Sequence, residues 1–190
     1  MPDTSLTTPN SLHIQGLEGL PTSIIPVPYV RLVQPSSKNT EISDGVEAKP
    51  GNFLFNDTKQ EVESLSFVLL RAKHGQVQFE RDGELVTTSK IAILGVTDNR
   101  KLFILSLSPT SFSNFGQLIA QLKEKDITAS WLYEILATSE KKENEKGKFY
   151  VVKFGIKNKL EETELAEMEE LAKNYTSVPE RRESEEKEPF

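Results

Sequence analysis

A succession of short apolar, β-branched runs separated by turn signals is the feature that most constrains the fold of this chain. Runs of this kind are typical of strands, and dipeptides such as Asp82-Gly83 and Asp98-Asn99 are typical of the turns that join them. We also interpret His74-Gly75 as a turn. The sequence therefore predicts a mainly β protein. The predicted strands are residues 27–33, 52–56, 63–74, 76–81, 89–97, 101–107, 127–138 and 148–156.

Two further segments have helical periodicity instead of strand alternation. The first, residues 111–125, follows a Ser-Pro-Thr-Ser opening, and its apolar side chains recur at helical spacing, which predicts that they face a core. The second, residues 161–174, ends before Pro179. The predicted core positions of the first helix are Phe112, Phe115, Leu118, Ile119 and Leu122, and those of the second are Leu165, Met168, Leu171 and Ala172.

The order of these elements is several strands, one helix, a two-stranded hairpin and a terminal helix. A small antiparallel barrel with a helix between its third and fourth strands is the pattern of an oligonucleotide/oligosaccharide-binding (OB) fold. In this interpretation residues 127–157 form strands four and five, joined by a charged, mobile tip at residues 139–147. Because the sequence predicts more than five strands, we expect an elaborated, OB-fold-like antiparallel barrel.

The chain divides into four predicted regions. A flexible arm at residues 1–26 is rich in Thr, Ser, Pro and Gly, and the barrel follows at 27–160, including a long loop at 35–50. The C-terminal helix is expected at 161–175 and a disordered acidic tail at 176–190. Residues 161–190 carry 4 Lys/Arg and 11 Asp/Glu, whereas residues 1–160 carry 19 and 18. The acidity therefore belongs to the C-terminal end, and the body can hold local basic patches.

Composition argues against several classes of function. The chain has no cysteine, and its two histidines, His13 and His74, have no neighbouring ligand spacing, so we expect no metal and no cofactor. A phosphate-binding glycine loop and a nucleophile elbow are both absent, which predicts that the protein is not an enzyme. No apolar run is long enough to span a membrane and the N-terminus does not have the pattern of a secretory signal, so a cytoplasmic protein is expected.

The last residues, from Glu180 to Phe190, form a charged, mostly acidic run that ends in Pro-Phe. This end resembles the C-terminal tip of bacterial and phage single-stranded-DNA-binding proteins. The resemblance implies an OB-fold core that binds DNA and a tip that recruits replication and repair enzymes. Lys187 interrupts the acidic run and departs from the pattern. The residues that the resemblance assigns to partner binding are Glu183, Glu185, Glu186, Glu188, Pro189 and Phe190.

Binding an unpaired strand requires cations for the phosphates and exposed aromatic rings for the bases. The predicted hairpin supplies both, because lysines alternate along one face of its second strand and continue into its tip. A second set lies on the strands around His74-Gly75, and a third candidate is the single tryptophan with the tyrosine two residues later. The predicted nucleic-acid-binding residues are Arg71, Lys73, Phe79, Arg81, Trp131, Tyr133, Lys141, Lys142, Lys146, Lys148, Phe149, Lys153 and Lys157.

Together these features predict a protein that coats and protects single-stranded DNA during replication or recombination, in phage or bacteria. Two alternatives stay open at this point. One is a non-enzymatic viral protein-interaction or assembly module. The other is an RNA-binding or strand-annealing β-barrel. A homo-oligomer is compatible with each of them.

Overall fold

In the computed structural model, the described residues are 26–36, 41–43, 45–81, 84–175 and 178–179. Most of the predicted N-terminal arm and acidic tail lies outside them. The strands are β1 (Tyr29–Leu32), β2 (Glu41–Ser43), β3 (Val46–Glu47), β4 (Phe53–Phe55), β5 (Glu61–Val62), β6 (Leu65–Arg81), β7 (Glu84–Thr97), β8 (Leu102–Leu107), β9 (Tyr133–Asn144) and β10 (Gly147–Lys159). The helices are the short 3-10 turns η2 (Pro109–Ser111) and η3 (Ser130–Leu132), and the α-helices α1 (Phe112–Glu124) and α2 (Glu162–Asn174).

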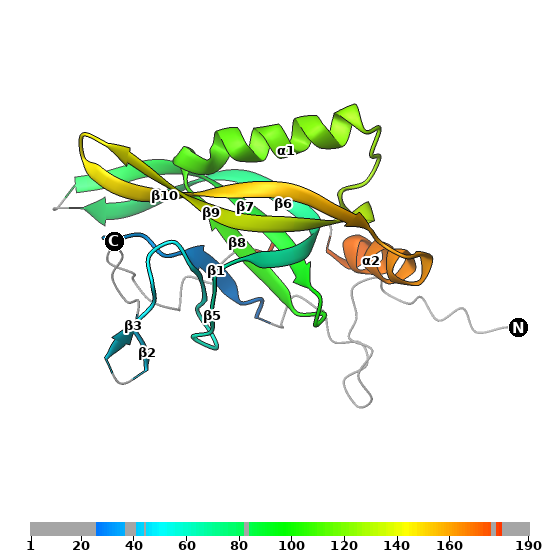
Figure 1. The fold of residues 1–190 in the computed structure, drawn as a ribbon, viewed down its shortest axis with the longest axis horizontal. Helices are drawn as coiled ribbons and strands as arrows, with labels where there is room; N and C mark the ends of the chain where they lie inside the picture. Colours follow the sequence, from blue (N-terminus) through cyan, green and yellow to red (C-terminus); the bar gives the residue numbers. More distant parts are fainter. Residues whose placement is uncertain (1–25, 37–40, 44, 82–83, 176–177, 180–190) are drawn as a thin grey trace, which may run out of the picture.

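Eight of the strands form one sheet that curls into a half-barrel, in the order β10-β9-β6-β7-β8-β1-β4-β5 (Figure 1). The prediction of a mainly β protein is confirmed. The sheet is not antiparallel throughout, however, because β1 pairs with β8 in parallel. These two strands are far apart in the sequence, which is the situation in which parallel pairing is possible. Strands β2 and β3 form a separate small hairpin inside the predicted long loop.

The two α-helices cover opposite faces of the sheet. The helix α1 packs inside the curl, where its Phe115, Leu118 and Leu122 join buried side chains of β1, β4 and β6 to β10. The helix α2 packs on the outer face through Met168 and Ala172. Both helices were predicted, and the expected apolar positions of α1 all belong to the inner core.

Alternate side chains of β6 enter these two cores. Phe67 and Leu69 lie in the inner core, whereas Val68 and Leu70 lie in the outer one. Burial on both faces explains why this stretch is an almost continuous apolar run in the sequence. The predicted burial of Phe67 is confirmed, since its side chain is 0% exposed.

The predicted turn at His74-Gly75 is wrong. Strand β6 continues to Arg81, and Gly75 pairs with Lys90 of β7 in an unbroken antiparallel register. A long partner strand provides hydrogen bonds on both sides of the glycine, so nothing forces the chain to reverse there. The register instead shifts earlier, between Leu69 and Arg71, which marks a β-bulge.

The predicted extent of the hairpin tip, residues 139–147, is also wrong. Strands β9 and β10 pair as far as Asn144 and Gly147, so the turn consists of residues 145–146 alone. Gly147 has a φ of +118°, which glycine adopts without strain. The charged side chains project from a regular two-stranded ladder, because backbone pairing does not require apolar side chains where both faces meet water.

Side chains, and not a strand, complete the curl at the free edge of β10. The Gln34 amide donates to the Tyr150 carbonyl at 2.9 Å, and the Tyr150 N–H donates to the Gln34 Oε1 at 2.8 Å. The Val152 N–H donates to Ser111 Oγ at 3.0 Å, and Asn114 Nδ2 donates to the Val152 carbonyl at 2.8 Å. These bonds satisfy the backbone groups of Tyr150 and Val152, which would otherwise be open to another chain at this edge.

Gly95 in β7 tests how tightly the inner core is packed. A Cβ atom at this position would lie 2.6 Å from the Phe103 ring and 2.8 Å from the Phe67 ring, and both rings are fully buried. We expect Gly95→Ala to lower the free energy of unfolding by about 1–3 kcal/mol, measured by urea denaturation. Gly155→Ala in β10 is the matched control, because nothing lies within 4 Å of its added Cβ. Equal stability of the two variants would contradict the tight packing at Gly95.

Candidate nucleic-acid interface

The β9–β10 hairpin concentrates positive charge on an otherwise balanced body. Residues 139–159 contain seven lysines and three glutamates. The hairpin extends beyond the start of α1, to the left in Figure 1. Lys141, Lys146 and Lys148 are exposed, and in the part of the chain that the structure describes none of them has an ion-pair partner. These three ammonium groups are therefore available to a polyanion.

Each face of this hairpin carries an aromatic ring directly opposite a lysine. Phe149 pairs with Lys142 across the two strands, and Tyr150 pairs with Lys141 on the other face. Both rings are partly buried. Tyr150 lies against Gly51, and its backbone is held by Gln34, so its position is fixed. The pairing places one ring and one cation together on both sides of the hairpin.

Three other predicted lysines form ion pairs with two glutamates within the protein. The carboxylate of Glu140 accepts from Lys142 at 2.9 Å and from Lys153 at 3.1 Å. These hydrogen bonds, the one from Lys142 first, lower the pKa of Glu140 below its ordinary value, so its charge is firmly present at neutral pH. Lys157 donates to Glu134 at 2.9 Å and to Ser66 Oγ at 3.1 Å. The outer face of the hairpin is thus less positive than the sequence indicates.

Arg71 is committed to the C-terminal end of α2. Its guanidinium donates to the backbone carbonyls of Tyr175 at 3.0 Å, of Leu70 at 3.0 Å and of Ala172. A cation near the end of a helix also interacts favourably with the helix dipole. The side chain therefore fastens α2 to the sheet, and each of its three nitrogens donates one of these bonds.

Trp131 lies beside Arg71 and not on a strand. The predicted strand at residues 127–138 is wrong in its first part, because residues 130–132 form the 3-10 turn η3 and β9 begins only at Tyr133. The Arg71 guanidinium carbon lies 5.3 Å from the centre of the Trp131 ring, a cation–π contact. The ring is partly buried against the outer core.

The remaining predicted residues divide into two groups. Lys73 is exposed on β6, on the segment beyond the bulge. The side chains of Phe79 and Arg81 fall outside the described residues, and so does the whole predicted partner-binding set, which is Glu183, Glu185, Glu186, Glu188, Pro189 and Phe190. The structure therefore brings together the hairpin residues and places Arg71 with Trp131 at α2.

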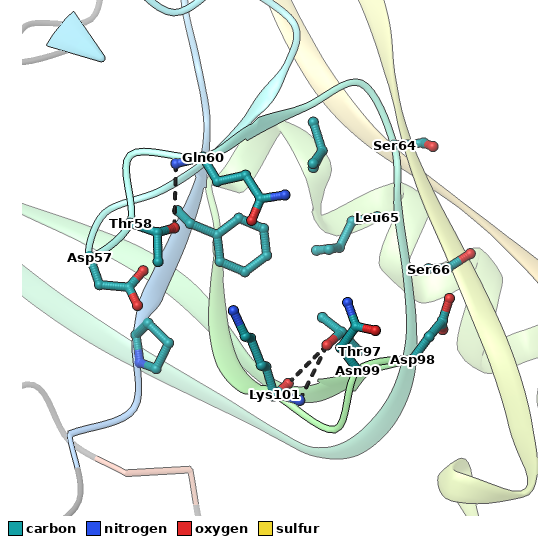
Figure 2. Close-up of a pocket in the computed structure, with 13 residues that line it drawn as sticks. Asp57, Thr58, Gln60, Ser64, Leu65, Ser66, Thr97, Asp98, Asn99 and Lys101 are labelled. Atoms are coloured by element: carbon teal, nitrogen blue, oxygen red, sulfur yellow. Dashed lines mark hydrogen bonds between the residues drawn. The ribbon is translucent and has the colours of Figure 1, made fainter. Parts of the chain in front are cut away.

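A pocket of about 270 Å³, lined by both polar and apolar side chains, opens between the β4–β5 turn, the β7–β8 turn and the start of β6 (Figure 2). Its apolar lining includes Phe55 and Leu65, and the side chains of Gln60 and Lys101 extend toward its middle (Figure 2). The carboxylates of Asp57 and Asp98 also line it, and they oppose the binding of a polyanion. Its lining residues are Pro28, Phe55, Asp57, Thr58, Gln60, Val62, Ser64, Leu65, Ser66, Thr97, Asp98, Asn99 and Lys101.

Sequence reasoning did not find this pocket, since it is assembled from the β4–β5 turn, the β7–β8 turn and the start of β6. Its polar residues have no common spacing in the sequence that could have indicated it. Its mixed charge does not suit a polyanion.

In the described ranges, no group of three or more His, Cys, Asp or Glu side chains could hold a metal ion. Neither α-helix described here has the length and apolar character needed to cross a membrane. No protein-family model, curated protein or solved structure matches the chain.

Arg71 provides a test of its structural role. We expect Arg71→Lys to lower the free energy of unfolding by about 1–3 kcal/mol, because an ammonium cannot reproduce the fork of carbonyl bonds. Loss of the contact should also shift the fluorescence emission of Trp131, the only tryptophan. Chemical denaturation followed by tryptophan emission measures both effects.

Arg100→Lys is the matched control for this variant. Arg100 also reaches α2, through Glu167 at 3.0 Å, but this ion pair is exposed. Its loss should change the free energy of unfolding by less than about 1 kcal/mol. Equal destabilisation by the two substitutions would argue against the special role of Arg71.

Proposed function

We propose that this protein binds single-stranded DNA along the β9–β10 hairpin. The observation that supports this most directly is the group of exposed, unpaired lysines, Lys141, Lys146 and Lys148, on a projecting hairpin that also carries Phe149. Lysines follow the phosphates and a partly exposed ring stacks on a base, which together bind a strand with little regard for its sequence. A double helix would keep its bases inside and leave the ring without a partner.

The arrangement of strands supports the same proposal. A three-stranded meander, β6–β7–β8, is followed by α1 and the hairpin β9–β10, and β9 returns to pair with β6. This order is the one expected for the core of an OB fold. OB folds bind oligonucleotides partly with the loops between their first and second and their fourth and fifth strands. The corresponding ends here, of β6–β7 and of β9–β10, both extend to the left in Figure 1.

The acidic C-terminal run completes the proposal. By resemblance to the tip of single-stranded-DNA-binding proteins, Phe190 would fill an apolar pocket on a replication or repair enzyme. The glutamates before it would meet basic side chains around that pocket. Strand binding and partner recruitment would then reside in separate parts of the chain.

The three unpaired lysines give the main test. We expect the combined variant Lys141→Gln, Lys146→Gln and Lys148→Gln to bind a fluorescent oligo-dT strand more weakly, measured by anisotropy across a salt series. Each lost phosphate contact removes about 0.7 from the slope of log affinity against log salt concentration, so the slope should fall by about 2.

The matched control replaces three exposed lysines elsewhere, Lys59, Lys123 and Lys125, by glutamine. It therefore has the same net charge as the first triple variant. If both triple variants lose affinity equally, the effect is one of overall charge and the hairpin is not the site. If the unaltered protein does not bind at low salt, the proposal fails. Stronger binding to a ribose strand of the same sequence would favour the RNA-binding alternative.

Glu140 gives a test in the opposite direction. Because its carboxylate pairs with Lys142 and Lys153, we expect Glu140→Gln to release both ammonium groups and raise oligo-dT affinity several-fold at low salt. Glu124→Gln, on the end of α1, removes the same charge at a distance and should leave affinity within about twofold. Unchanged affinity in the Glu140 variant would place the bound strand elsewhere.

A further inference from the structure

The two aromatic rings of the β9–β10 hairpin belong to opposite faces of the ribbon. Tyr150 shares its face with Val152 and Phe154, which pack in the inner core. Phe149 shares the other, outer face with Lys153. A nucleic-acid strand would therefore meet a different set of neighbours at each ring.

The lysines beside the two rings differ in their partners. On the outer face Lys142, opposite Phe149, is held by Glu140. On the inner face Lys141, opposite Tyr150, is exposed and has no ion-pair partner among the residues that the structure describes. A phosphate next to a base on the inner ring would therefore meet a cation that no carboxylate holds.

The backbone geometry brings this inner lysine close to its ring. Both backbone polar groups of Tyr150 bond to Gln34, on the side away from β9. Tyr150 and Lys141 therefore form a non-hydrogen-bonded pair, in which opposite Cα atoms lie only about 4.5 Å apart. Lys148, two residues before Tyr150, lies on the same face, opposite Glu143. Within the described ranges Glu143 forms no ion pair, so the ring has an available lysine on each strand.

The ring of Tyr150 is also held in place from a distant part of the sequence. Gly51, with a φ of +96°, lies against it, and a Cβ atom at this position would be 2.6 Å from Cε1 and 2.8 Å from Cδ1 of the ring. The Gly51 N–H donates to the Val33 carbonyl at 2.8 Å, which ties this loop to the end of β1. A ring that is already immobilised loses less conformational entropy when a base stacks on it.

We propose that the hairpin recognises an unpaired base, and not the phosphate chain alone, and that Tyr150, positioned by Gly51, is the ring on which the base stacks. This inference rests on the proposed function of the hairpin. Lysine side chains are long and flexible enough to reach a phosphate from either face of a two-stranded ribbon, so loss or gain of a lysine does not distinguish the two faces. The stacking ring distinguishes them.

Two fluorescent strands of equal length separate the bases from the phosphates: oligo-dT, and a strand of deoxyribose phosphates without bases. The ratio of their affinities, measured by anisotropy at one low salt concentration, gives the contribution of the bases. We expect Tyr150→Leu to lower this ratio by about fivefold or more, and Tyr150→Phe to keep it. Phe149→Leu, on the outer face, is the matched control and should also keep it. Partial unfolding of a variant would lower both affinities together and leave their ratio unchanged.

Gly51→Ala tests how the ring is positioned. The added methyl group would displace the Tyr150 ring, so the affinity ratio should fall while binding of the strand without bases stays the same. Gly45→Ala is the control, because Gly45 also has a positive φ, +78°, but nothing lies within 4 Å of its added Cβ. A ratio that Gly51→Ala leaves unchanged, or that both variants lower equally, would contradict the positioning role of Gly51.

The outcomes separate this inference from the function on which it rests. If the unaltered protein binds neither strand, the proposed function fails and this inference fails with it. If the protein binds both strands equally, the hairpin holds phosphates alone and base recognition is excluded. An unchanged ratio in Tyr150→Leu, or an equal loss in Phe149→Leu, would overturn the assignment of Tyr150 and leave the hairpin as the binding site.

Discussion

The fold depends on how a strongly curled sheet is completed without a closing strand. The side chains of Gln34, Ser111 and Asn114 supply the hydrogen bonds that a neighbouring strand would give to β10. Ser111 is itself buried at the start of α1, so the same residue positions the helix and satisfies the edge. Because these bonds involve Tyr150 and Val152, the closure also fixes the base of the β9–β10 hairpin. The inner core and the candidate interface thus share one constraint.

Closure at the base leaves the ends of both long hairpins with no third strand beside them among the described residues. In the outer part of each hairpin, β9 pairs only with β10 and β6 pairs only with β7. Both ribbons meet water on both faces there. Isolated two-stranded ribbons are only marginally stable, so charge pairs and a fixed base have a large influence on them. Glu140 links Lys142 and Lys153 across the two strands of its hairpin and so stabilises the ribbon while reducing its positive charge. Ion pairs that hold the shape of the hairpin thus use part of the positive charge that it would otherwise present to a nucleic-acid strand.

The elements that were predicted correctly are those whose signal is local. The spacing of Phe115, Leu118 and Leu122 alone indicated α1 and its buried face, and most of the strands followed from apolar runs. The turn at His74-Gly75 was wrong because pairing with β7, a non-local interaction, overrides a glycine in a strand. Arg71 could not be understood from the sequence, since its carbonyl partners on α2 lie about a hundred positions away. The β8–β1 parallel pair, the pocket at the barrel end and the side-chain closure of β10 are non-local in the same sense.

At the candidate site, such non-local contacts decide which of the predicted cations remain available to a ligand. In the sequence Arg71 and the lysines of residues 141–157 are equivalent cations, but in the structure Arg71 belongs to α2 and three of the lysines belong to glutamates. The exposed ammonium groups of Lys141, Lys146 and Lys148 remain at the end of this hairpin. They lie near the ring of Tyr150, whose backbone is held by Gln34. If a nucleic-acid strand binds here as proposed, a surface of this size would contact few phosphates, so we expect weak and reversible binding at physiological salt. A protein that covered long unpaired stretches with such a surface would need many copies acting side by side.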